Sequence, residues 1–259
     1  MKFKDYFSEV AEGYAQTRFI YPPEIFAWLA EMAPDSKLAW DCGTGNGQAA
    51  IGLAEHFERV VATDASAAQI AHAYPHSRIE YKVTLEKESG LADASVALVT
   101  SFLAAHWFDQ KAFFTEVRRV MVEQGVCALW CYDVPKISTD IDPILEEFYF
   151  ETIKPWAPPE RALIDTRYRD LEFPFDEIEP PPFSSETRWT LKQLMDQART
   201  WSAVRRYQNN CGQDPLVPLA ERLKPYWGEG KHSLIWHLHG RVGYYCRFPA
   251  FNAKCKNPD

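Results

Sequence analysis

The sequence predicts an α/β protein built on a doubly wound, mostly parallel sheet. Stretches typical of strands and of helices alternate between about residues 38 and 133, which is the order of strand–helix–strand units. A glycine-rich loop joins the first of these strands to its helix. The chain has 259 residues, 46% of them apolar, and can therefore bury a substantial core. We expect one domain with a ligand at the carboxyl ends of the strands.

The glycine-rich loop lies in residues 38–47, LAWDCGTGNG, where an apolar run ends in Asp41. The glycines that follow occupy every second position: Gly43, Gly45 and Gly47. Glycine lets the backbone turn sharply and approach a bound group closely. Residues 48–57 have helical spacing, so the amino end of a helix is expected to face the same spot. This predicts a ligand loop.

The glycine spacing separates two ligand classes. A dinucleotide fingerprint needs a third glycine where this chain has Gln48. The next apolar run ends in Asp64, about 17 residues after Gly47, close to the place of a ribose-binding acid. The alternative is a set of turn glycines with a surface aspartate. Loop and acid together favour a nucleoside-containing ligand.

The other elements follow from periodicity and end signals. Pro22 and Pro23 precede a helical stretch, Asp109 can cap a long helix, and Gly125 can end it. Strands are expected at residues 59–63, 78–84, 94–103, 126–133 and 183–190, with a strand pair or one long strand at 233–248. Helices are expected at residues 23–33, 66–75, 109–124, 190–207 and 216–227.

Residues 134–182 have a different composition. They hold nine of the chain's 18 prolines, yet they are rich in aromatic residues, which disordered segments lack. We expect an ordered insert or lid within a single domain of residues 1–259, whose core is residues 1–133 and 183–248.

Charge and composition exclude some classes of partner. The net charge is −8, and without a basic run nucleic acid is not expected as a substrate. The six cysteines are scattered without a CxxC pair, which suits a reduced, cytoplasmic protein. The apolar-rich stretch at residues 94–108 is too short to span a bilayer, so no membrane association is expected. The sequence does not predict the oligomeric state.

Several motifs together carry a resemblance. The stretches DCGTGNG, VVATDAS, TLEKESGLADASVALVT, AAHWFD and EVRRVMVEQGVCALW resemble the class I S-adenosylmethionine-dependent methyltransferases of the methyltransferase type 11 group. They are similar to trans-aconitate methyltransferase and its relatives. RTWSAVRRY and YWGEG are similar to the carboxyl-terminal part of that group. The resemblance covers residues 1–133 and roughly 183–248. It implies a Rossmann-like fold, S-adenosyl-L-methionine as cofactor and a small-molecule substrate.

The resemblance also implies roles for individual residues. The methionine end of the cofactor would be held by Asp41, Gly43 and Gly45, the ribose by Asp64, and the adenine by Leu85 and Glu86. His106 and Trp107 would face the methyl group and the substrate. Relatives often have glutamine where this chain has Leu103, so their substrates do not transfer directly.

Methyl transfer leaves the acceptor open. Our first choice is a carboxylic acid that yields a methyl ester. Arg18 is the preferred anchor for its carboxylate, and the insert arginines Arg161, Arg167 and Arg169 are the alternatives. The runner-up is an amine, phenol or other hydroxyl compound, with His106 as catalytic base. A non-catalytic cofactor-binding protein is the third reading.

Two expectations limit the chemistry further. His106 could instead be a buried core histidine beside Trp107. No metal is expected, because His237 and His239 share a strand face without further ligands nearby. The sequence contains no GxSxG nucleophile elbow, so a hydrolase is not expected.

Overall fold

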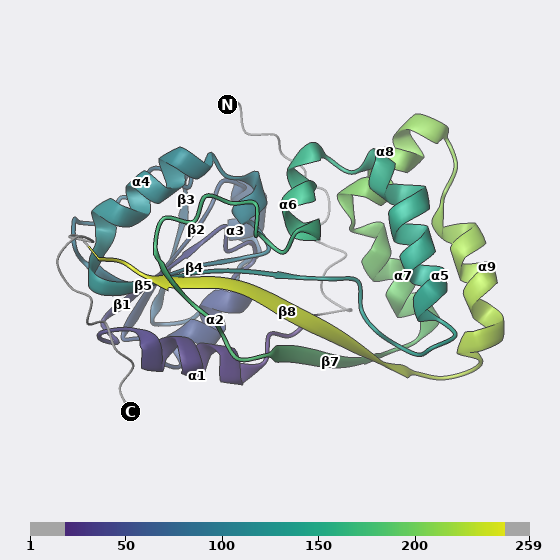
Figure 1. Cartoon of the computed structure of the whole chain (residues 1–259), viewed down its shortest axis with the longest axis horizontal. Coiled ribbons are helices and arrows are strands. Elements are labelled where there is room, and N and C mark those ends of the chain that lie inside the picture. The colour runs from purple at the N-terminus through teal and green to yellow at the C-terminus, as the bar shows by residue number, and fades with distance from the viewer. Residues whose placement is uncertain (1–18, 247–259) are drawn as a thin grey trace.

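The computed structural model describes residues 19–246 (Figure 1). Within them, eight strands form one sheet in the order β3-β2-β1-β4-β5-β8-β6, with β7 paired to β8. β1 to β5 run parallel, while β8 is antiparallel to β5, β6 and β7. The expected mostly parallel sheet is confirmed. The strands are β1 (Leu38–Cys42), β2 (Arg59–Asp64), β3 (Ile79–Val83), β4 (Val96–Phe102), β5 (Met121–Tyr132), β6 (Asp176–Ile178), β7 (Phe183–Trp189) and β8 (His232–Tyr244).

Helices cover both faces of the parallel strands, as a doubly wound sheet requires. Alternate residues of a strand point to opposite faces, so Ala39 packs with α1 and α2 whereas Trp40 packs with α4. Both side chains are fully buried. The α-helices are α1 (Pro23–Met32), α2 (Gln48–Ala54), α3 (Ala67–Ala71), α4 (Gln110–Val120), α5 (Asp142–Glu147), α6 (Ala162–Asp165), α7 (Leu191–Arg199), α8 (Ser202–Cys211) and α9 (Leu216–Trp227).

The two ends of α4 differ in how well the sequence predicted them. Asp109 caps the helix as expected, because its side chain accepts a hydrogen bond from the N–H of Ala112 at 3.2 Å. The expectation that Gly125 ends it is wrong. β5 begins at Met121, which pairs with Val96, and Gln124 has a φ of 62°. Sheet pairing therefore overrides the helical spacing of these last residues.

The carboxyl-terminal third contains a second departure. Residues 190–207 form two helices, because α7 ends near Thr200, whose hydroxyl donates to the carbonyl oxygen of Gln197 at 2.7 Å. Residues 233–248 were expected as a strand pair or one long strand, and residues 232–244 form the single strand β8. Its first half pairs with β7 and its second half with β5.

The insert at residues 134–182 consists of ordered short elements within the described chain. Besides α5, α6 and β6 it contains three short helical turns: η3 (Phe148–Ile153), η4 (Lys154–Trp156) and η5 (Pro159–Arg161). α5 packs on α9, and η4 packs on α8. Figure 1 shows α5, α7, α8 and α9 together at the far end of the β7–β8 ribbon, away from α4. The helices α5, α7, α8 and α9 therefore form one helical layer beside the sheet, whereas β6 of the same insert belongs to the sheet. No helix among residues 19–246 is long and apolar enough to cross a bilayer.

Candidate active site

A cavity of about 350 Å³ lies at the carboxyl ends of the parallel strands. Each of the five strands contributes lining residues at or just after its end, for example Cys42 from β1 and Tyr132 from β5. Four lining residues come from outside the stretch of chain between the start of β1 and the end of β5: Phe19, Tyr21, Glu160 and Gln197. Every residue that the resemblance implied for cofactor binding also lines this cavity: Asp41, Gly43, Gly45, Asp64, Leu85 and Glu86.

The glycine loop has left-handed backbone at its glycines. Gly43 has a φ of 72°, and a Cβ there would lie 2.4 Å from the Cβ of Ala104, so the position admits no side chain. Gly45 has a φ of 57°, but the nearest atom to a Cβ would be Oε1 of Gln69, 3.8 Å away. Gly45 therefore leaves open space beside the backbone, as close approach of a ligand requires.

Asp41 ties the glycine loop to the neighbouring strand β4. Its carboxylate accepts hydrogen bonds from the hydroxyls of Thr44 at 2.6 Å and Thr100 at 2.8 Å, which ties the loop to β4. Burial raises the pKa of Asp41 to about 6, although the two hydroxyls oppose this and the charge of Asp64 adds to it. The site therefore holds a carboxylate that is costly to ionise and that attracts a cation.

Asp64, at the end of β2, holds the same loop from the side. Its two carboxylate oxygens accept the N–H groups of Gly45 and Ser66, both at 2.8 Å. A half-buried carboxylate at the end of the second strand that lines the cavity beside the loop is the kind of group that accepts ribose hydroxyls, so the residues present fit an adenosyl cofactor.

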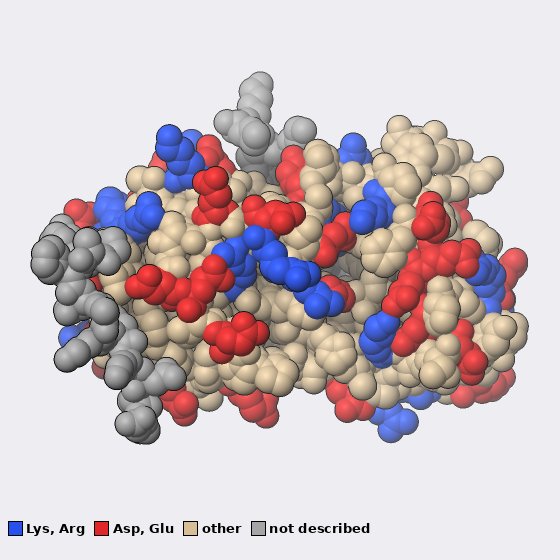
Figure 2. Space-filling view, viewed as in Figure 1, with Lys and Arg blue, Asp and Glu red and all other residues tan. Residues whose placement is uncertain are grey.

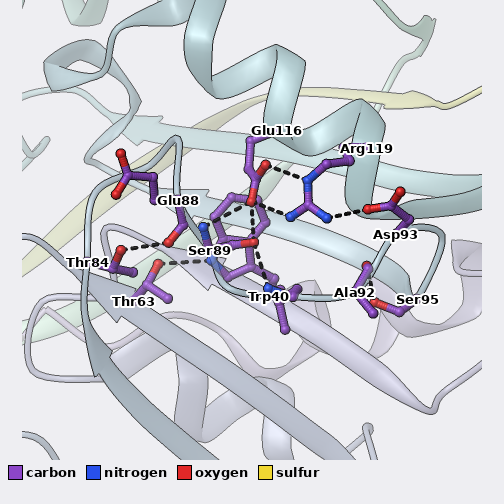
Figure 3. Close-up of polar contacts among 11 residues, drawn as sticks. Trp40, Thr63, Thr84, Glu88, Ser89, Ala92, Asp93, Ser95, Glu116 and Arg119 are labelled. Carbon is purple, nitrogen blue, oxygen red and sulfur yellow. Dashed lines mark hydrogen bonds and ion pairs between the residues drawn. The ribbon is translucent and has the colours of Figure 1, made fainter.

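The loop after β3 is anchored on α4 by a polar network (Figure 3). Glu116 is only 7% exposed and accepts hydrogen bonds from the N–H and hydroxyl of Ser89, at 3.0 and 2.5 Å. Arg119 donates to Glu116 through Nε at 2.8 Å and also pairs with Asp93. This loop carries Leu85 to the cavity. The three-residue spacing of Glu116 and Arg119 on a predicted helix is the one sequence signal that could have revealed this network.

Aromatic rings line the β4–β5 end of the cavity. Phe19 stacks on Tyr132 with ring centroids 4.4 Å apart, and Tyr21 lies 4.6 Å from Phe102. Trp107, the expected substrate contact, also lines the cavity. Because β1 to β3 carry the glycine loop, Asp64 and the loop with Leu85 and Glu86, we take the β4–β5 end as the acceptor end.

His106 lies elsewhere. It is 3% exposed and is absent from the cavity lining, and its Nδ1 lies 3.2 Å from the hydroxyl of Tyr168. Burial, with the charge of Arg161, lowers the pKa of His106 well below its usual value. This geometry disfavours the expected role of His106 as catalytic base, because the ring is buried and does not line the cavity.

None of the arginines expected to anchor a carboxylate is among the described residues that line the cavity. Arg18 lies outside the residues that the structure describes. Arg167 pairs with Asp133 at 2.8 Å, and Nε of Arg169 donates to the carbonyl of Thr166 at 3.1 Å. Arg161 also does not line the cavity. Among residues 19–246, the acceptor end therefore presents no cation.

His237 and His239 do not form a metal site with other residues in the described part of the chain. His239 lies 2.7 Å from Asp133, His237 is exposed, and residues 19–246 contain no group of three or more side chains suited to a metal ion. Figure 2 shows acidic and basic side chains interspersed on the visible face.

Comparisons with known proteins agree with this site. The profile of the methyltransferase domain matches residues 40–129. The chain is 30% identical to a Dictyostelium discoideum protein provisionally named a methyltransferase, over 86% of each chain. It is 27% identical to the methyltransferase cfoB of Aspergillus candidus, covering 83% of this chain and 68% of that protein. A solved structure from Anaeromyxobacter dehalogenans, provisionally described as a type II methyltransferase, is 39% identical with a TM-score of 0.82, covering 88% of this chain and 97% of that one. The chain belongs to the class I S-adenosylmethionine-dependent methyltransferases, and S-adenosyl-L-methionine is its cofactor.

Proposed function

We propose that this methyltransferase acts on an N–H or O–H group of a small molecule, such as an amine, a phenol or another hydroxyl compound. The supporting observation is the chemistry of the acceptor end: aromatic rings, the carboxylate of Glu160 and the amide of Gln197 line it, and the described lining has no arginine. Lys87 lines the cavity on the loop after β3, at the opposite end. A carboxylate acceptor beside Glu160 would meet like charge without a fixed cation. This reverses the order of preference that the sequence suggested.

The residues present suit a positioning mechanism. S-adenosylmethionine supplies a methyl group on a positively charged sulfur. The glycine loop with Asp41 would hold the methionine end, and Asp64 would hold the ribose. The rings of Tyr21, Phe102 and Tyr132 exclude water and favour positive charge near their faces. Alignment and exclusion of water are what an in-line displacement chiefly needs from a protein.

A carboxylic acid that gives a methyl ester remains the second candidate. The observation that favours it is Phe19, which lines the cavity and directly follows Arg18 in the sequence. A carboxylate nucleophile needs no catalytic base. That agrees with a cavity from which His106 is absent.

The acceptor class can be tested by incubating the protein with methyl-labelled cofactor and a panel of amines, phenols and carboxylic acids. Mass spectrometry then identifies the labelled products. We expect N-methyl or O-methyl products from amines or phenols. Labelled methyl esters as the sole products would overturn the proposal in favour of the second candidate. Gly45→Val is the negative control, because a β-branched residue is strained at a φ of 57°.

A further inference from the structure

We propose that Glu160 is a catalytic residue that accepts the proton of the acceptor's N–H or O–H group, and that Gln197 orients the acceptor. This inference rests on the proposed function and names the residues that perform it. Neither residue belongs to any of the motifs that the sequence displays. They come from η5 and α7, far apart in the chain, and both line the folded cavity.

Gln197 is buried but has unused hydrogen-bonding capacity. It is 3% exposed and lines the cavity, in a helix whose neighbouring Leu194 and Ala198 are buried. Its main-chain oxygen accepts from Thr200, but no residue within 19–246 hydrogen-bonds to its side-chain amide. A bound molecule with polar groups of its own would satisfy this amide.

Glu160 brings a carboxylate to the same end of the cavity. η5 packs against η2 (Ala105–Trp107), the turn that follows β4 and carries Trp107. Glu160 is half-buried, and its carboxylate has no ion pair or hydrogen bond with any other residue in the described part of the chain. The positive charge of the adjacent Arg161 acts to lower the pKa values of His106 and Tyr168, which are buried and do not line the cavity. Glu160 thus lines the cavity with a carboxylate whose lone pairs no other described residue uses.

The proton balance of the reaction explains why such a group is useful. The lone pair of a neutral amine or of a hydroxyl forms the new bond to the methyl carbon. The carbon–sulfur bond breaks, and its electron pair stays on sulfur. The acceptor then carries one proton too many, which passes to the Glu160 carboxylate and from there to water. Five residues with a carboxyl group line the cavity among residues 19–246. The carboxylates of Asp41, Asp64, Glu86 and Asp109 each accept at least one hydrogen bond from another residue, whereas that of Glu160 accepts none within this part of the chain.

A binding experiment tests the position of Glu160 without knowing the acceptor. Sinefungin carries an amine-bearing carbon where the cofactor has its methylated sulfur, whereas S-adenosylhomocysteine has a neutral sulfur there. We expect Glu160→Gln to weaken sinefungin binding about fivefold to tenfold by calorimetry, and to leave S-adenosylhomocysteine binding within about twofold. Glu160→Asp should recover part of the loss. Glu172→Gln, an exposed glutamate of the same insert, is the matched control. Equal affinities of wild type and Glu160→Gln for sinefungin would overturn the inference.

Turnover of the amine or phenol found in the panel gives the second readout. Glu160→Gln should lower kcat about 100-fold, the scale of one lost catalytic base. Gln197→Met should instead raise KM about tenfold. Across a series of phenols, the loss caused by Glu160→Gln should shrink as the phenol becomes more acidic, because an ionised phenol has no proton to give. A loss of equal size for every phenol would overturn the proton-accepting role.

The two possible failures are distinguishable. If amines or phenols are methylated but the Glu160 variants behave like wild type, this inference fails and the proposed function stands. If carboxylic acids alone are methylated, the proposed function itself fails.

Discussion

The two halves of the cavity differ in how their polar groups are held. In the cofactor half, Asp64 accepts two main-chain N–H groups and Asp41 accepts two threonine hydroxyls. In the acceptor half, the side chains of Glu160 and Gln197 have no such partners among residues 19–246. The first half is thus preorganised for one ligand, and the second keeps its hydrogen-bonding capacity for the substrate. Substitutions should therefore affect cofactor and acceptor separately.

The largest effect on the cofactor half is expected from Asp64→Ala. The variant removes the group that orders Gly45 and Ser66 and the proposed ribose contact at once. Hydrogen bonds to a charged group are worth about 1.5 to 3 kcal/mol each, so we expect affinity for S-adenosylhomocysteine to fall about 100-fold or more in calorimetry. Asp170→Ala, an exposed aspartate of the insert, is the control. Unchanged affinity in a folded Asp64→Ala variant would remove Asp64 from the site.

The cofactor half was also the half that the sequence predicted. The glycine loop and Asp64 lie within 24 residues, counted from Asp41 to Asp64, on two adjacent strands of an alternating pattern. Local spacing is enough to place such groups together. The acceptor half joins segments near residues 19, 103, 132, 160 and 197, and no local pattern links them.

Two misplaced expectations show the same limit. His106 and Trp107 are neighbours on one short turn, yet Trp107 lines the cavity while His106 is buried behind it. Which of two adjacent residues faces the cavity depends on how the turn packs against η5. The end of α4 was misplaced because strand pairing of Met121 outweighed helical spacing.

Asp41→Asn should separate binding from stability. The pKa of Asp41 rises from 3.8 to about 6 in the folded chain, so the fold prefers its protonated form. The free energy of folding that is lost by ionising buried Asp41 is therefore absent below pH 3.8, grows as the pH rises, and is complete above pH 6. A shift of this size corresponds to about 3 kcal/mol at pH 7. One threonine hydroxyl must turn to accept from the new amide, so we expect a net gain of about 2 kcal/mol.

Denaturant unfolding at pH 4 and pH 8 measures this gain, which should appear at pH 8 and be small at pH 4. Cofactor affinity should fall about tenfold, because the ionised carboxylate attracts the ammonium group of the methionine moiety. A variant less stable than wild type at pH 8 would contradict the burial argument for Asp41.

Glu116→Gln tests whether the loop after β3, which carries Leu85 and Glu86, is held in place from outside the cavity. Burial raises the pKa of Glu116, but hydrogen bonds from Arg119 and Ser89 outweigh it and keep the pKa below its usual value. The charge therefore stabilises the fold above the ordinary glutamate pKa, and this contribution is lost as the pH falls. We expect a loss of about 1 to 2 kcal/mol of unfolding free energy at pH 7, and cofactor affinity lowered about threefold. Glu88→Gln, an exposed residue of the same loop, should change neither.

The smallest effect is expected from Leu103→Asn, and it sharpens the comparison most. Leu103 lines the acceptor half with a φ of 56°, a left-handed conformation that asparagine adopts more readily than leucine. Ala94, exposed and remote from the cavity lining, has a φ of 49° and provides the matched variant Ala94→Asn. Both substitutions relieve backbone strain. In thermal unfolding, the free energy of unfolding should therefore change by about 0.5 kcal/mol or less, once the packing that Leu103→Asn loses is taken into account. Affinity for S-adenosylhomocysteine should stay within about twofold for both, and Leu103→Asn alone should change KM for the acceptor. If Leu103→Asn also weakened cofactor binding while Ala94→Asn did not, the two halves would be coupled through the end of β4, and their separation would be wrong.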